Sequence, residues 1–318
     1  MKKIDKDIKH IDSFTVTRWI NNNNWNELQS YLNTIPKDKA LEIANKAVST
    51  SSNNPHSLLC LSYCLLKNEK YDMAFNTAKK AQKKLSSKQI VLTKQIEMML
   101  KRVSPIWSTP LKGKQLTLLR IEPRHKEYLL QTRKNNEFQH HYNIFISDCE
   151  KTLIHDIQVA KKPPIDTRKI EWIIEKDNKE IGIATLAGLD IHNRTAELLV
   201  GLPGEKSFKD SLEATLLVLE FAFCKINLHK LVSYVYSDNP SAQSNTMHLG
   251  FEQEGFQKSQ IYDATTNTRL DMYINGCLCE NFFGNKKLMK MAERLIGRDL
   301  RPKKFKYSKL NIINSRTK

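Results

Sequence analysis

A spacing of 34 residues between two alanine triplets is the feature that most constrains how this chain folds. The triplets are Ala40, Ala44 and Ala47, then Ala74, Ala78 and Ala81. Alanines three or four positions apart lie on one face of a helix, where small side chains let a second helix approach closely. Leu58, Leu61 and Leu65 supply the bulky residues of the helix between them. We therefore expect an all-α region over residues 1–104, capped by a third helix over Ser86–Val103.

The same segment resembles the tetratricopeptide repeat family over about Phe14–Val103. The 34-residue register is the period of that family, and "NEKYDMA" (Asn68–Ala74) is similar to its turn into the second helix. Ser62 stands where the family has a glycine, and the first copy opens irregularly at Trp25. The resemblance implies a concave groove that binds protein. The alternative is a generic domain of helical hairpins.

From Leu116 onward the pattern changes to strands mixed with helices. "SPIWSTPLKGK", with two prolines and a glycine, indicates a linker over residues 105–114. Residues 115–276 then form an α+β or α/β domain, with turns expected at Lys176–Lys179 and Asp190–Arg194. Residues 277–318 form a basic C-terminal helix and tail. Lys286–Lys318 carries 12 Lys or Arg against Glu293 and Asp299, within a chain of net charge +17.

Two stretches of this domain resemble the GNAT superfamily of acyl-CoA-dependent N-acyltransferases. They are "RTAELLVGLP" and "LEATLLVLEFAFCKINLHKLVSYVYSDNPSAQSNTMHLGFEQEGF", within a match over about Leu116–Asn275. The most similar branch acetylates ribosomal-protein N-termini and amino sugars. The resemblance implies a GNAT-type mixed sheet with flanking helices, acetyl-CoA or another acyl-CoA as cofactor, and an amine acceptor.

The family's mechanism depends on a gap between two parallel strands, expected here at Ala196–Leu202 and Leu231–Ser237. An extended pantetheine arm hydrogen-bonds to the main chain exposed in such a gap, and the next helix N-terminus receives the phosphates. Glu197 matches an acidic position that serves as general base, although a structural role fits it equally. The resemblance assigns cofactor contacts to Leu199, Val200, Gly201, Lys206, Ser207, Lys209, Ser211 and Asn239.

Several family positions carry other residues in this chain. Ser207, Lys209 and Ser211 replace the glycines of the phosphate loop, and Asp210 would repel a pyrophosphate or cap the helix together with Ser207. Thr246 occupies the position of the general-acid tyrosine. Tyrosines elsewhere are candidate substitutes for it, namely Tyr234, Tyr236 and Tyr262. The "NNEFQHHY" insert is expected to line the acceptor site.

Three functions follow from this pattern. The first is an N-acyltransferase that moves an acyl group from a CoA thioester to a primary amine of a small molecule or protein. The second takes the acyl group from the phosphopantetheine of an acyl carrier protein, whose acidic surface would be attracted by the basic tail or the repeat groove. The third is an inactive GNAT-fold adaptor. The basic tail also fits a solvated docking helix, RNA or an anionic membrane surface.

The cysteines and histidines predict neither disulfides nor a metal site. Six cysteines show no CxxC pair and fit reduced thiols, and no histidine has metal-ligand spacing. The opening "MKKIDKDIKHIDSF" has no apolar segment of a secretory signal, and no apolar run is long enough to span a bilayer. We therefore expect a cytoplasmic protein.

Overall fold

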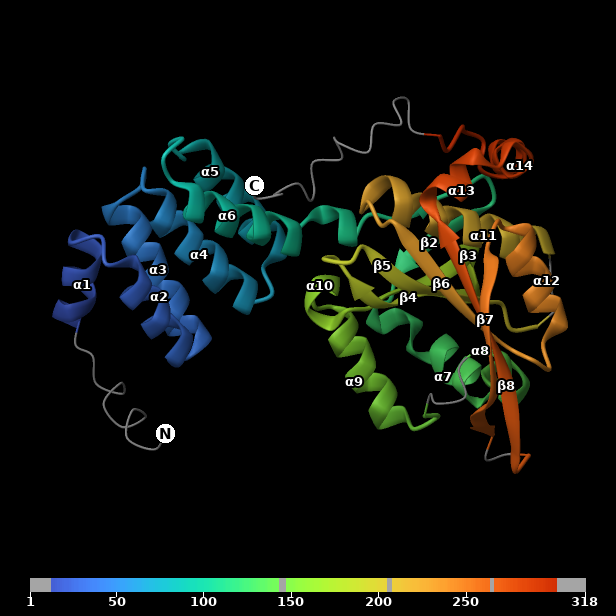
Figure 1. Cartoon of the computed structure of the whole chain (residues 1–318). Helices are drawn as coiled ribbons and strands as arrows, with labels where there is room; N and C mark the ends of the chain where they lie inside the picture. Colours follow the sequence, from blue (N-terminus) through green and yellow to red (C-terminus); the bar gives the residue numbers. More distant parts are fainter. Residues whose placement is uncertain (1–12, 143–146, 205–207, 264–265, 302–318) are drawn as a thin grey trace. The chain divides into compact units, whose positions relative to one another are not determined.

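The computed structural model describes residues 13–142, 147–204, 208–263 and 266–301, and the chain divides into two compact units after Trp107. The first unit is all helical, and the second contains an eight-stranded mixed sheet with helices on both faces (Figure 1). The predicted fold class, an α+β domain that follows an all-α region, is confirmed. Within the described residues, no helix is both long and apolar enough to cross a membrane.

The helical unit reproduces the 34-residue offset seen in the sequence. Its helices are α1 (Ser13–Asn21), α2 (Trp25–Thr34), α3 (Lys37–Thr50), α4 (Pro55–Lys67), α5 (Tyr71–Lys83) and α6 (Ile90–Arg102). All six alanines of the two triplets, on α3 and α5, are fully buried. Ser62 of α4 is also fully buried, and its hydroxyl donates to the Ala74 carbonyl oxygen at 2.7 Å. The serine thus fixes the α4–α5 contact through a hydrogen bond.

The sheet of the second unit has the strand order β1-β2-β3-β4-β5-β6-β8-β7. Its strands are β1 (Leu111–Lys112), β2 (Leu116–Arg120), β3 (Ile170–Lys176), β4 (Lys179–Asp190), β5 (Thr195–Gly201), β6 (Lys230–Tyr236), β7 (Glu252–Asp263) and β8 (Thr268–Leu278). Neighbouring strands are antiparallel except β5 and β6, which are parallel. A parallel pair needs a crossover connection, and α11 with the turn that follows it supplies this connection.

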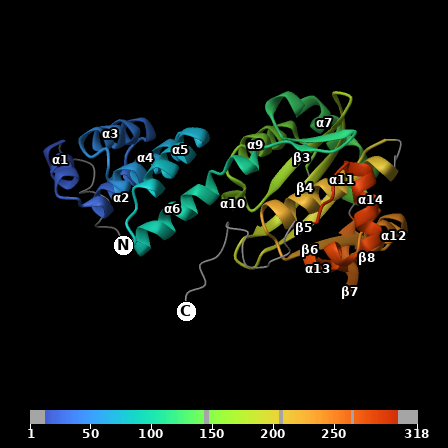
Figure 2. The same ribbon diagram turned by 90° about the horizontal axis from the view of Figure 1, so that it is seen from above.

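Helices cover both faces of the sheet (Figure 2). One face carries α7 (Lys126–Lys134), α8 (Asn136–Tyr142), α9 (Glu150–Ala160) and α10 (Pro164–Thr167). The other carries α11 (Phe208–Glu220), a π-helical turn (Phe221–Lys225), α13 (Cys279–Gly284) and α14 (Lys286–Ile296), while α12 (Pro240–His248) follows β6. Trp172 of β3 packs edge-on against Phe221 with ring centroids 5.3 Å apart, and both side chains are buried.

Segments on either side of the predicted GNAT-like domain also pack into the second unit. The expected linker 105–114 contains β1, and Glu213 of α11 accepts hydrogen bonds from the backbone N–H groups of Gln115 and Leu116, at 2.9 and 3.2 Å. At the other end, β8 runs to Leu278, and α14 buries Leu288, Met289, Ala292 and Ile296. Most of the basic tail, residues 302–318, lies outside the described residues.

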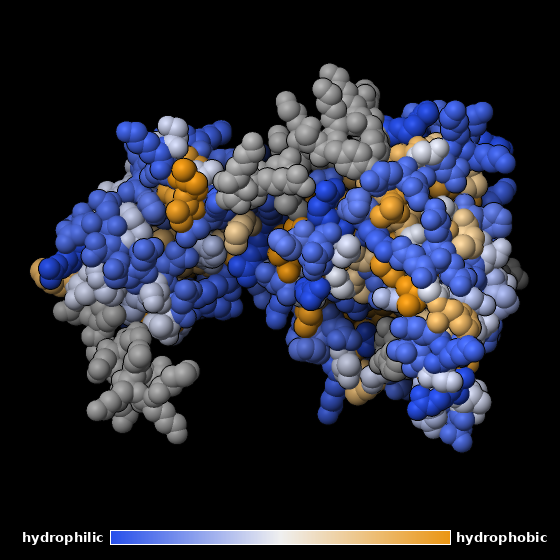
Figure 3. Space-filling view, viewed as in Figure 1, coloured by the Kyte–Doolittle hydropathy of each residue, from blue (hydrophilic) through white to orange (hydrophobic). Residues whose placement is uncertain are grey.

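The surface shown in Figure 3 is largely hydrophilic, with apolar side chains in small separate groups.

We predict that Ala78→Leu destabilises the helical unit by about 1–3 kcal/mol, because a close-packed helix contact has no room for three more carbons. Asn76→Leu is the matched control, since Asn76 is exposed on the same helix and receives the same side chain. Urea unfolding of the full chain, followed by circular dichroism at 222 nm, measures both. Equal midpoints for the two variants would show that the α4–α5 contact is not tight.

Candidate functional site

The site is built around a separation of β5 from β6. The two strands pair only at Thr195–Lys230, Ala196–Leu231 and Glu197–Val232. Beyond Glu197, β5 continues to pair with β4 as far as Gly201, while β6 continues to pair with β8 as far as Tyr236. The last residues of β5 therefore have a ladder partner on one side only. The sequence-based expectation of two parallel strands that splay apart is confirmed.

A cavity of about 580 Å³ lies where the strands separate. Its lining comes from four segments that are distant in the chain: α8 with the preceding residues, the end of β5, the start of α11, and α12. The lining residues are Asn135, Glu137, Phe138, His141, Tyr142, Val200, Gly201, Leu202, Pro203, Gly204, Phe208, Ser211, Asn239, Ser241, Ala242 and Asn245. Five of these residues belong to the "NNEFQHHY" insert, whose expected role in lining the acceptor site stays a prediction.

Gly201 lies directly under two aromatic rings of α8. A Cβ atom at this position would lie 2.6 Å from Phe138 Cε2 and 2.6 Å from Tyr142 Cδ2, so a larger residue would force these rings to shift. The Phe138 and Tyr142 rings stack with centroids 5.0 Å apart. The close approach of these two rings to the main chain is thus the structural reason for a glycine at this end of β5.

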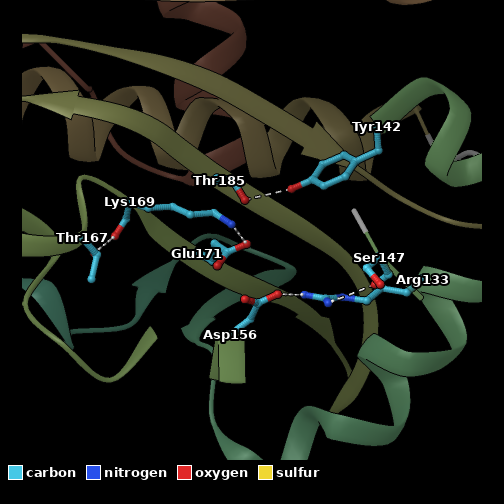
Figure 4. Close-up of polar contacts among 8 residues, drawn as sticks. All are labelled: Arg133, Tyr142, Ser147, Asp156, Thr167, Lys169, Glu171 and Thr185. Carbon is cyan, nitrogen blue, oxygen red and sulfur yellow. Dashed lines mark hydrogen bonds and ion pairs between the residues drawn. The ribbon is translucent and has the colours of Figure 1, made fainter. Parts of the chain in front are cut away.

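Tyr142 was not singled out from the sequence, yet its side chain lies in the cavity wall and is hydrogen-bonded to a strand. Its hydroxyl lies 2.9 Å from the Thr185 hydroxyl, as Figure 4 shows. Burial raises the pKa of Tyr142, and the carboxylates of Glu171 and Glu197 raise it further. The phenol therefore stays protonated at neutral pH and can donate a hydrogen bond. A tyrosine beside two histidines in a polar insert was the only signal in the sequence.

Glu197 lies on the same face of the sheet as Thr185. The strand register pairs Glu197 with Ala187, two residues from Thr185. It also pairs Thr185 with Glu171, and both of these side chains are drawn in Figure 4. Burial raises the pKa of Glu197, which moves a carboxylate toward the range of a general base that operates near neutral pH. Burial also raises the pKa of Tyr236, with contributions from Glu197 and Asp238. Glu197 itself is half-buried and does not line the cavity.

His140 joins three segments around the cavity. Its Nε2 lies 2.5 Å from Asp238 Oδ2 in the turn after β6, and its Nδ1 lies 3.3 Å from Asp263 Oδ2 at the end of β7. Asp263 is buried, and Asp238 immediately precedes the cavity residue Asn239. These contacts hold α8 against the strand ends and so fix one wall of the cavity.

The first turn of α11 differs from the sequence-based expectation for Asp210. Both carboxylate oxygens of Asp210 accept hydrogen bonds from Lys176 Nζ, at 3.0 and 2.9 Å, and the side chain is buried. The expected repulsion of an anion is therefore wrong, because a lysine from β3 neutralises this carboxylate. The proposed capping partner Ser207 lies outside the described residues. Phe208 and Ser211 place the beginning of this helix in the cavity wall.

Asn239 and Thr246 have local roles in α12. The Asn239 side chain accepts a hydrogen bond from the Ala242 N–H at 3.1 Å and so caps the helix at the cavity edge. Thr246 donates from its hydroxyl to the Ala242 carbonyl oxygen at 2.8 Å and is not among the cavity residues. Asn239 is thus placed at the site, whereas the Thr246 hydroxyl is directed to its own helix.

The other predicted cofactor residues divide into three groups. Val200, Gly201 and Ser211 line the cavity. Leu199 is half-buried in the open part of β5, and Lys209 is exposed on the first turn of α11, but neither lines the cavity. Lys206 and Ser207 lie outside the described residues.

The structure also brings together side chains whose spacing in sequence gave no indication of a metal site. Ligand atoms of His140, His141 and Asp238 lie within 4.8 Å of one another. Both ring nitrogens of His140 already contact carboxylates, which accounts for this cluster as an ion-paired contact between α8 and the strand ends. We assign no metal to it.

Comparison with known proteins gives a likeness in solved structures alone. No protein-family model and no curated protein sequence matches the chain. The spermidine N-acetyltransferase of Vibrio cholerae in complex with CoA and spermine is 20% identical, with a TM-score of 0.47, over 54% of this chain and 99% of that one. A dodecameric structure of spermidine N-acetyltransferase from the same organism is 18% identical, with a TM-score of 0.47, over 55% and 99%.

We predict that Asn239→Ala lowers the free energy of unfolding by about 0.5–2 kcal/mol, because α12 loses its N-cap, and that Asn239→Ser retains most of the stability. Urea unfolding of the full-length variants measures both. If the serine variant is as unstable as the alanine variant, capping is not the main structural role of Asn239.

Proposed function

We propose that the second unit is a GNAT-type N-acyltransferase that transfers an acyl group from a CoA thioester to a primary amine. The observation that carries this proposal is the parting of β5 from β6 after Glu197 and Val232, with a cavity at the opening. A strand edge without a partner offers main-chain N–H and C=O groups to an extended chain containing amides. The pantetheine arm of CoA is such a chain.

The start of α11 supports the placement of the donor phosphates. The first residues of a helix have free N–H groups and the positive end of the helix dipole, both of which favour anions. Phe208 and Ser211 put this helix end at the cavity. Lys176 offsets the negative charge of Asp210, which would otherwise oppose the binding of an anion here. We assign main-chain contacts to Leu199, Val200 and Gly201, and phosphate contacts to Lys206, Ser207, Lys209 and Ser211.

The acceptor amine must lose a proton before it attacks the thioester carbonyl. We assign this step to Glu197, directly or through water, because its pKa is raised by burial and it lies on the sheet face that also carries Thr185. The amine nitrogen then forms the amide bond as the carbon–sulfur bond breaks, and CoA leaves as a thiol or thiolate. A thiol with a pKa of about 8.5 leaves without strong acid assistance. Burial, with a contribution from Glu197, raises the pKa of Tyr142 and of Tyr236, so both phenols stay protonated and are the candidate proton donors.

We further propose that the first unit is a short tetratricopeptide-type array that binds a protein. The 34-residue offset, the six buried alanines and the α4–α5 hydrogen bond support this assignment. Its described residues bear an excess of lysine over acidic side chains, which favours an acidic protein partner. An acyl carrier protein is one such partner, and a donor role for it is the alternative to free acyl-CoA.

Acetyl-CoA should raise the melting temperature of the full-length protein and should release CoA thiol in the presence of an amine acceptor. Thermal shift measures the first effect, and thiol titration with a panel of polyamines, amino sugars and peptide N-termini measures the second. If acylated carrier protein raises the melting temperature and acetyl-CoA does not, the carrier protein is the donor instead of CoA. If neither donor changes the melting temperature or releases thiol, the second unit is a non-enzymatic adaptor.

Glu197→Gln should reduce kcat by about 10²- to 10⁴-fold while changing acetyl-CoA affinity less than twofold, because it removes the proton acceptor and keeps the side-chain shape. In the parent protein, turnover should fall as the pH is lowered through the raised pKa of Glu197, since the protonated carboxyl cannot accept a proton. That acidic limb should be absent from the pH profile of the variant. Parallel losses of turnover and donor affinity would assign Glu197 a structural role.

A further inference from the structure

A second cavity, of about 600 Å³, adjoins the first along α11 and α12. Its lining residues are Phe208, Ser211, Leu212, Thr215, Asn245, Met247, His248, Leu249, Asn285, Lys287, Leu288 and Met291. The two cavities share Phe208, Ser211 and Asn245. They are therefore adjacent, with the first turns of α11 and the middle of α12 forming part of the wall of both.

The second cavity differs from the first because α14 forms one of its walls. This helix belongs to the segment after Asn275, which the resemblance to acyltransferases does not cover. Among its lining residues, Leu212, Leu249 and Leu288 are buried, and Met247 and Met291 are half-buried. These side chains provide an apolar slot, and the thioethers adapt readily to a flat aromatic ring.

The electrostatic character of this cavity favours an anion. No acidic residue occurs among the described residues that line it, whereas Lys287 and His248 are exposed at its edge. Lys287 takes part in none of the ion pairs found among the described residues. An apolar slot with a lysine at its rim matches a heteroaromatic ring attached to a phosphate-bearing sugar.

The α14 wall is held in place at its C-terminal end. Lys114 Nζ donates to the Arg294 carbonyl oxygen at 2.8 Å, and Arg298 donates to the Lys112 carbonyl oxygen at 2.8 Å and pairs with Glu220. At the other end, the Asn285 side chain caps the helix by accepting from the Leu288 N–H at 3.1 Å. The slot is therefore formed before any ligand enters it, which lowers the entropic cost of binding.

We infer that α14 completes a site for the adenosine 3′-phosphate end of CoA, with the ring in the slot between α11, α12 and α14 and the 3′-phosphate beside Lys287. This inference rests on the proposed acyltransferase function and adds a binding residue from outside the family-like region. It also favours CoA over a carrier protein as donor, because carrier-bound phosphopantetheine has no adenosine to occupy the slot.

The test compares CoA with 3′-dephospho-CoA, measured by isothermal titration calorimetry on full-length protein. The parent should bind CoA about three- to tenfold more tightly, as expected for one partly exposed lysine–phosphate contact. Lys287→Gln should remove this preference and leave the affinity for 3′-dephospho-CoA unchanged. Lys290→Gln is the matched control, since Lys290 is exposed on the same helix but does not line the cavity.

A second variant tests the slot itself. Met291→Glu places a carboxylate in the apolar wall, so it should weaken both CoA and 3′-dephospho-CoA while leaving the affinity for phosphopantetheine unchanged. The inference is overturned if Lys287→Gln keeps the preference for CoA or if Lys290→Gln removes it equally. Failure of the parent to bind any CoA species would instead reject the acyltransferase function, and the adenosine site with it.

Discussion

The second unit depends on a sheet that opens at one place without losing its integrity. Past Glu197, β5 keeps its hydrogen bonds to β4, and past Val232, β6 keeps its hydrogen bonds to β8. Each strand is therefore held by an outer neighbour while its inner edge is free. A free strand edge is normally a liability because it recruits other strands. Here the edge lies beside a cavity whose other walls include residues of α8, α11 and α12, which limits what can pair with it.

Interactions between distant segments give this opening its walls. His140 on α8 contacts Asp238, 98 residues later, and Lys176 on β3 neutralises Asp210 on α11. Each contact joins a helix to the strands or to the turn that follows one, and each brings a basic side chain against a carboxylate near the opening. Burial raises the pKa of Glu197 on β5 and of Tyr142 at the end of α8, so the packing of these elements sets the protonation of both groups.

The fold class and the parting of the strands were accessible from the sequence because both have local signatures. Alanine spacing reports helix packing, and the segments around Ala196 and Leu231 carry a recognisable family pattern. Side-chain partners have no such signature. The Asp210 carboxylate of α11 looked repulsive to an anion because its partner Lys176 is 34 residues earlier, on β3. Tyr142 went unnoticed because Thr185 and Gly201 lie in other elements.

The basic C-terminal segment shows why net charge is a weak guide to partners when taken over a whole chain. Within its described part, Arg298 and Arg301 pair with Glu220 and Asp299, so these cations serve structure or are locally compensated. Lys287 differs, because it borders an apolar slot that adjoins the strand opening and contains no carboxylate among its described lining residues. A cationic side chain binds a specific anion when the residues around it carry no opposing carboxylate and offer an apolar surface for the rest of the ligand. By this criterion α14 is a component of the site, since it supplies both the cation and the apolar wall that give that cation a specific ligand.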